Sequence, residues 1–78
     1  MSDELLSRIT SDPEVCGGKP IIRGLRVRVA DILDMLASGM TTADIIREYP
    51  YLEADDVPAA LAFAARAVDH PIAISKAS

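Results

Sequence analysis

The sequence predicts a mainly α-helical protein in which a small N-terminal β-hairpin precedes three helices. Residues 25–29 (LRVRV) alternate apolar and basic side chains, which is typical of a strand with one buried face. From about residue 30 the apolar spacing becomes helical, with glycine and proline at the expected ends. Because 78 residues suffice for one small domain, we place that domain at residues 1–70 and a short tail at residues 71–78.

The hairpin is predicted from two short apolar runs on either side of a tight turn. Residues 5–10 have some strand character, and the turn residues after them are followed by Ile21–Ile22. We expect this pair to meet residues 27–29 around a turn at residues 23–24. The pleat would then place Arg26 and Arg28 together on the face opposite the apolar side chains.

The first two helices are predicted from periodicity and from capping residues. Apolar residues at 29, 32, 33 and 36 mark one helical face, and Gly39 stands where a glycine would end the helix. Asp31 and Asp34 lie near its positive N-terminal end. Thr41, followed by Asp44 three residues later, resembles a capping box, and Pro50 ends this second helix.

The third helix is expected from about residue 56 to residue 69. Pro58 is tolerated only in a first turn, which favours Asp55 or Asp56 as the cap; otherwise these acids read as solvated charge. Three helices joined by short turns predict a helix-turn-helix-like (winged-helix-like) domain. The expected core comprises Ile32, Leu36, Ile45, Ile46, Leu52, Val57 and Leu61.

The composition of the third helix is unusual for a helix that reads DNA. Residues 57–68 (VPAALAFAARAV) contain one charged side chain and no Asn, Gln, Ser or Lys to contact base edges. A helix that is apolar nearly all round is buried on more than one face. We therefore expect Phe63 and Ala67 to face a second chain, as a homodimer or with a partner. Ile72 and Ile74 in the tail can add a strand to a partner's sheet, fold back or fray.

Basic residues are concentrated near the hairpin. Residues 1–28 hold five basic and four acidic side chains, whereas residues 29–78 hold three and eight. The candidate contacts for DNA or a protein partner are Lys19, Arg23, Arg26 and Arg28. The alternative is that the arginines only solubilise an exposed sheet edge. The residues expected to form structural turns are Gly17, Gly18, Pro20, Gly24 and Gly39.

Catalytic and metal-binding chemistry is not indicated. GGKP lacks the earlier glycine and the following Ser or Thr of a phosphate-binding loop. Cys16, the single cysteine, excludes an intrachain disulfide, and with His70 it does not indicate a nucleophile and base. The first ten residues include no apolar run of signal-peptide or membrane-span length. We expect a cytoplasmic, non-enzymatic protein without metal or cofactor and without membrane attachment.

The run from Asp12 to Val27, DPEVCGGKPIIRGLRV, resembles the signature of the domain-of-unknown-function 433 family, close to DPxxCGGKPxIxGTRxxV. Later matches are Gly39-Met40-Thr41, Ile46, Tyr49-Pro50, Leu52, Val57 and Ala60-Leu61. The resemblance covers about residues 8–70. One departure is Leu25, where the family commonly has a threonine whose hydroxyl could serve a turn or a phosphate.

The resemblance implies a small helix-turn-helix-like protein, and several family members are taken to be antitoxins of type II toxin–antitoxin pairs. Such an antitoxin binds a cognate toxin, often a nuclease of the PilT N-terminus-like class, and can repress its own operon. The basic hairpin would then contact operator DNA or pair with carboxylates at the toxin's metal site. The alternative function is a homodimeric protein-interaction module that does not bind DNA.

Overall fold

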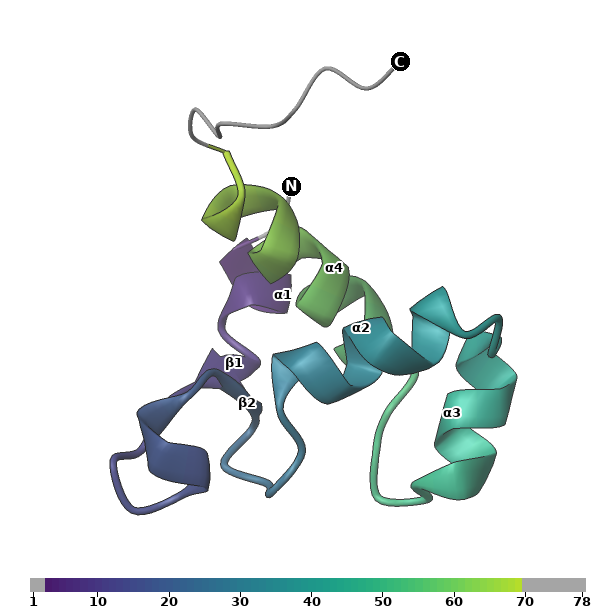
Figure 1. Ribbon diagram of the computed structural model, residues 1–78, viewed down its shortest axis with the longest axis horizontal. Coiled ribbons are helices and arrows are strands. Elements are labelled where there is room, and N and C mark those ends of the chain that lie inside the picture. The colour runs from purple at the N-terminus through teal and green to yellow at the C-terminus, as the bar shows by residue number, and fades with distance from the viewer. Residues whose placement is uncertain (1–2, 70–78) are drawn as a thin grey trace.

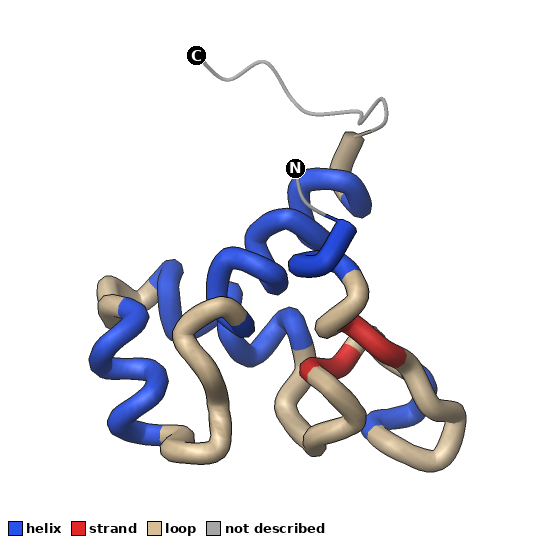
Figure 2. Tube along the Cα trace, turned by 180° about the vertical axis from the view of Figure 1, so that it is seen from behind, coloured by secondary structure: helices blue, strands red, loops and turns tan. Residues whose placement is uncertain are grey.

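The computed structural model describes residues 3–69, in which four helices and a two-stranded sheet form one small fold (Figure 1). In chain order the elements are α1 (Asp3–Leu6), β1 (Ile9–Thr10), the 3₁₀ turn η1 (Cys16–Gly18), β2 (Ile21–Ile22), α2 (Val29–Ala37), α3 (Thr42–Glu48) and α4 (Asp56–Ala67). Helix α4 packs against both α1 and α2. The sheet and α3 lie at opposite ends of the molecule, as the view from behind also shows (Figure 2). The mainly α-helical class with a small antiparallel sheet is confirmed.

The two-stranded sheet has a different partner strand from the predicted one. β1 pairs antiparallel with β2, with Ile9 opposite Ile22 and Thr10 opposite Ile21. The segment 27–29 contributes only an isolated bridge between Ile21 and Arg28. It does not continue as a strand, because the chain enters α2 at Val29. The strand character assigned to residues 5–10 is correct for Ile9–Thr10 and wrong before them, where α1 forms.

A tight turn at residues 22–25 is present as predicted. Arg23 and Gly24 both have positive φ, 44° and 71°, and the Leu25 N–H donates to the Ile22 carbonyl at 2.7 Å. Two successive positive φ angles are the geometry of a type I′ turn, in which arginine is unusual at the first position. The Gly24 N–H donates to Thr10 Oγ1 at 3.0 Å. The hydroxyl that contacts this turn therefore comes from Thr10. Leu25, where the family commonly has a threonine, is half-buried against the core.

The glycine-rich loop is left-handed over three consecutive residues. Cys16, Gly17 and Gly18 have φ of 51°, 66° and 82°. A left-handed residue with a side chain costs about 1–2 kcal/mol, which explains two glycines in succession here. Pro20 follows the loop, and its carbonyl accepts from the Val29 N–H at 3.0 Å, which ties the loop to the start of α2.

Helices α2 and α3 form where the capping signals predict them. The Arg28 N–H donates to Asp31 Oδ2 at 2.9 Å at the start of α2, and Gly39 has φ of 97° just after its end. At α3 the Thr41 hydroxyl accepts from the Asp44 N–H at 3.1 Å, while the Asp44 carboxylate accepts from the Thr41 N–H at 2.9 Å. The predicted capping box is therefore confirmed.

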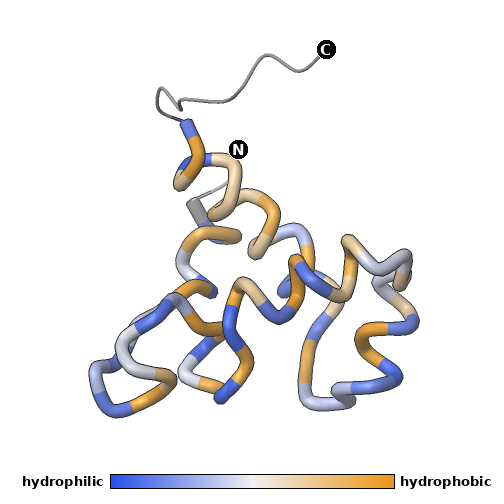
Figure 3. The backbone as a smooth tube through the Cα atoms, viewed as in Figure 1, coloured by the Kyte–Doolittle hydropathy of each residue, from blue (hydrophilic) through white to orange (hydrophobic). Residues whose placement is uncertain are grey.

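Helix α4 supplies one wall of the core with small side chains. The buried cluster contains Ile22, Val27, Val29, Ile32, Ile45, Leu52, Val57 and Ala60. Figure 3 shows apolar residues along most of α4, in contrast to the mixed pattern of α2. Leu61 is wrongly predicted as core, because it is 49% exposed and Ala59 and Ala60 are fully buried instead. The small side chains of Ala59 and Ala60 allow neighbouring elements to approach closely, and Leu61 lies on the exposed side of α4. No helix within residues 3–69 is long and apolar enough to cross a membrane.

Candidate functional site

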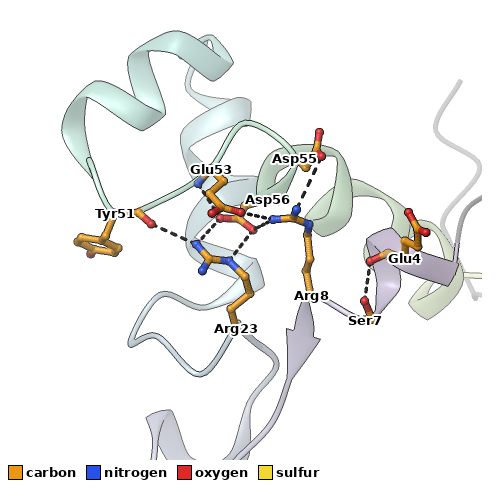
Figure 4. A network of polar contacts seen from close by, with 8 residues as sticks. All are labelled: Glu4, Ser7, Arg8, Arg23, Tyr51, Glu53, Asp55 and Asp56. Carbon is orange, nitrogen blue, oxygen red and sulfur yellow. Dashed lines mark hydrogen bonds and ion pairs between the residues drawn. The ribbon is translucent and has the colours of Figure 1, made fainter.

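A buried carboxylate joins two arginines from distant parts of the sequence (Figure 4). Asp56, in the first turn of α4, has no exposed surface. Arg8 Nη1 donates to its Oδ1 at 3.0 Å. Arg23 Nε and Nη2 donate to Oδ1 and Oδ2 at 3.1 and 3.0 Å, a bidentate contact. The Glu53 N–H donates to Oδ2 at 2.7 Å, so both carboxylate oxygens are fully used.

The electrostatics of this network favour the charged form of Asp56. Burial alone would raise the pKa of its carboxyl, but hydrogen bonds from Arg23, the Glu53 backbone and Arg8 outweigh burial and lower that pKa. The interpretation of Asp56 as a cap or a solvated charge is wrong, because its carboxylate points into the fold. Asp55, beside it, does occupy the cap position and makes no side-chain capping bond.

The network has a structural role that a single sequence did not reveal. It links Arg8, just before β1, and Arg23, just after β2 and with a positive φ of 44°, to the start of α4. Arg23 Nη2 also donates to the Tyr51 carbonyl at 3.1 Å. Arg8 and Asp56 are 48 positions apart, and no local pattern connects them.

The predicted basic cluster divides into two kinds of side chain. Arg23 belongs to the Asp56 network, and Arg28 Nη2 donates to Asp31 Oδ1 at 2.6 Å. Lys19 and Arg26 are exposed and make no side-chain hydrogen bond or ion pair within residues 3–69. Along residues 26–29 burial alternates, with Val27 and Val29 buried and Arg26 and Arg28 more exposed, but the Arg28 charge is engaged by Asp31 in the first turn of α2. Of the four candidates, Lys19 and Arg26 present available charge.

The predicted partner-contacting residues of α4 lie on an apolar surface. A groove of about 270 Å³ runs between the C-terminal half of α4 and the start of α2. It is lined by Lys19, Pro20, Arg28, Val29, Ala30, Leu33, Phe63, Ala64, Ala67 and Val68. Phe63 and Ala67 also line a neighbouring hollow with Leu6, Ile9 and Arg66, and Phe63 borders a third with Ile9 and Pro20. We call these three hollows together the Phe63 surface.

The structure therefore brings Lys19 and Arg28 to the same groove as Phe63 and Ala67, although they are more than thirty positions apart in sequence. Val68 at the edge of the groove is 58% exposed. The tail residues Ile72 and Ile74, and His70, lie outside the described residues. Within residues 3–69 no group of three His, Cys, Asp or Glu is placed to hold a metal ion.

Comparison with known proteins identifies the family. The model of the family described as "Protein of unknown function (DUF433)" matches residues 9–64. The chain belongs to the DUF433 family. A crystal structure of a DUF433 member protein from Anabaena variabilis ATCC 29413 matches with a TM-score of 0.73 and 30% identity, covering 82% of this chain and 63% of that chain.

A curated relative adds to this picture. "Uncharacterized protein y4eO" of Sinorhizobium fredii (strain NBRC 101917 / NGR234) is 34% identical over 56 residues, which are 72% of this chain and 25% of that protein. The chain thus spans a quarter of the curated relative and less than two thirds of the solved DUF433 protein. The matched region, 9–64, contains the sheet, the glycine-rich loop and most of α4.

Proposed function

We propose that this DUF433 protein is an antitoxin of a type II toxin–antitoxin pair, which neutralises a nuclease-like toxin by direct binding. The observation that carries the proposal is the Phe63 surface. An apolar groove on the outside of a small domain, bordered by half-exposed Phe63 and exposed Val68, is typical of a protein-binding site. The antitoxin role itself comes from the family resemblance described above. Binding, and not catalysis, is the proposed activity.

Repression of its own operon is the second part of the proposal. The exposed side chains on the N-terminal half of α4 are Pro58 and Leu61, preceded by the exposed acid Asp55, and none of them suits a DNA base edge or a phosphate. Lys19 and Arg26 have charge available for phosphates. We therefore assign any operator contact to the loop and turn that carry these two residues.

The test of toxin binding is co-expression with the product of the adjacent gene, followed by purification through a tag on one partner only. Ala67→Glu should abolish co-purification because Ala67 is exposed and lines the Phe63 surface. Ala65→Glu is the matched control, since Ala65 is an exposed alanine of the same helix outside these hollows. Failure of the unaltered protein to bind its neighbour, or equal loss in both variants, would contradict the proposal.

DNA binding is tested with duplexes from the upstream region at several salt concentrations. The double variant Lys19→Ala, Arg26→Ala should weaken binding and reduce the slope of log affinity against log salt by about one for each phosphate that is no longer neutralised. Arg47→Ala on α3 is the control. Equally weak binding to every sequence, erased by salt, would favour the alternative of a homodimeric protein-interaction module without DNA binding.

A further inference from the structure

The chain distributes its cations unevenly between internal partners and the surface. Of the seven basic side chains in residues 3–69, four form ion pairs: Arg8, Arg23, Arg28 and Arg47. The other three, Lys19, Arg26 and Arg66, have no ion-pair partner among the described residues. Lys19 lines one hollow of the Phe63 surface and Arg66 lines another, while Arg28, which is paired with Asp31, lines the same hollow as Lys19. Most of the unpaired positive charge therefore surrounds one apolar area.

The same surface has no acidic side chain in its lining. None of the three hollows that meet at Phe63 contains an Asp or Glu, although the whole chain carries twelve acids against eight basic residues. By contrast, the hollow beside the Asp56 network is lined by Glu4, Glu53 and Asp55 together with Arg8 and Arg23. A basic rim on an acidic protein does not follow from composition. It is a local property of this surface.

The charge pattern indicates what kind of partner covers the surface. In a twofold-symmetric dimer the same patch meets itself. Since the charged residues in the lining of this patch are all basic, each would then face a like charge. Such juxtaposition disfavours a second copy and favours a partner of opposite sign. The groove lies between two helices, and an amphipathic helix typically fills such a groove with its apolar side chains.

We propose that the Phe63 surface binds an amphipathic segment of a partner protein whose apolar side chains enter the groove and whose flanking carboxylates pair with Lys19 and Arg66. This inference rests on the proposed function, because the partner in question is the toxin, and it specifies the chemistry of the toxin's contact segment. The apolar groove supplies binding energy, while the two cations select the sign of the partner's charge and its orientation.

The test uses two synthetic amphipathic helical peptides with the same leucine positions, one flanked by glutamates and the other by lysines. Each is titrated into the full ¹⁵N-labelled chain, and backbone amide shifts are followed. The acidic peptide should bind about tenfold more tightly at low salt, an energy of the size expected for two exposed charge pairs that change sign. High salt should reduce this preference. The largest shifts should fall on Phe63, Ala64 and Ala67.

Charge reversal provides the decisive variants. Lys19→Glu with Arg66→Glu should reverse the peptide preference, whereas the control Arg26→Glu, also an unpaired exposed arginine, should leave it unchanged. Equal affinity for both peptides, or shifts on other elements, would overturn the inference. A dimer in sedimentation equilibrium that Ala67→Glu dissociates would assign the surface to a second copy instead. Tighter peptide binding by Ile72→Asp with Ile74→Asp would assign it to the protein's own tail.

The two proposals fail in distinguishable ways. If the adjacent gene product binds equally well to the Lys19→Glu, Arg66→Glu variant, the antitoxin role stands and the acidic contact segment is refuted. If the neighbour does not bind but the acidic peptide binds at Phe63, the antitoxin role is refuted and a surface for acidic amphipathic segments remains.

Discussion

Replacing Asp56 by Asn is the sharpest test of how this small domain is held together. The substitution keeps the shape of the side chain and removes its negative charge. It also replaces one of the two acceptor oxygens by an NH₂ donor. In the unaltered protein the carboxylate accepts four hydrogen bonds, from Arg8, from two nitrogens of Arg23 and from the Glu53 backbone. At least two of these bonds must be lost, and the new N–H₂ group faces other donors.

The size of the loss in unfolding free energy depends on how deeply Arg8 and Arg23 are buried. Hydrogen bonds to charged groups contribute about 1.5–3 kcal/mol each, and breaking a buried ion pair costs about 3–5 kcal/mol. Here the side chains of Arg8 and Arg23 are 26% and 32% exposed, so water partly replaces the missing carboxylate. We expect the free energy of unfolding to fall by about 3 kcal/mol, the lower end of that range. The total for a domain of this length is roughly 4–12 kcal/mol.

The assay is thermal and urea unfolding followed by circular dichroism, with Asp55→Asn as the matched control. For a domain of this size the loss corresponds to a decrease in Tm of roughly 12–24 °C. Asp55 is 68% exposed and lies 3.7 Å from Arg8 Nη2, so its substitution should change Tm very little. A decrease for Asp56→Asn no larger than for Asp55→Asn would refute the role assigned to the network.

The pH dependence gives an independent check. Because the folded state lowers the pKa of Asp56 below 3.8, its contribution to stability is fully present above about pH 4–5 and is lost as pH falls through the lower folded value. Asp31 and Asp44 also have lowered pKa values. They are present in the unaltered protein and in Asp56→Asn alike, so their effect on stability cancels in the difference between the two. The stability difference between the unaltered protein and Asp56→Asn should therefore shrink on acidification. A difference that stays constant down to about pH 2 would contradict this assignment.

Three further predictions concern the helix ends. Gly39→Ala should destabilise the fold by about 1–2 kcal/mol, because φ is 97° while no atom lies within 4 Å of the added methyl group; an unchanged urea midpoint would contradict this. Thr41→Ala should cost about 1 kcal/mol by removing the hydroxyl that accepts from the Asp44 N–H, and Thr41→Ser should recover most of the loss. Arg47→Ala should leave the urea midpoint unchanged, because its pair with Asp44 is exposed; a clear decrease would show that this pair stabilises α3.

The helices could be predicted from sequence because their signals are local. The capping box at Thr41 and the glycine at position 39 act within a few residues, and the structure has both where the sequence places them. The alternation at residues 25–29 correctly indicated buried Val27 and Val29. It could not reveal that α2 would begin at Val29, because an N-terminal helical turn and a strand end both accept a valine.

Long-range pairing could not be predicted in the same way. β2 pairs with Ile9–Thr10 in a fold where α1 packs against α4. The sequence of residues 9–10 does not indicate that packing, so it could not identify the partner strand. The Arg8–Asp56–Arg23 network is the clearest case. Each residue taken alone reads as an ordinary surface charge, and only the assembled fold makes the carboxylate buried and the guanidinium groups convergent.

The division of the cations makes folding and binding experimentally separable. Arg23 is engaged with a fully buried carboxylate, so its replacement changes stability and any resulting loss of binding is ambiguous. Lys19 and Arg66 have no ion-pair partner within residues 3–69 and are exposed, so reversing their charge should leave the unfolding midpoint close to that of the unaltered protein. A loss of partner binding in the Lys19→Glu, Arg66→Glu variant at unchanged Tm would therefore report the binding surface itself.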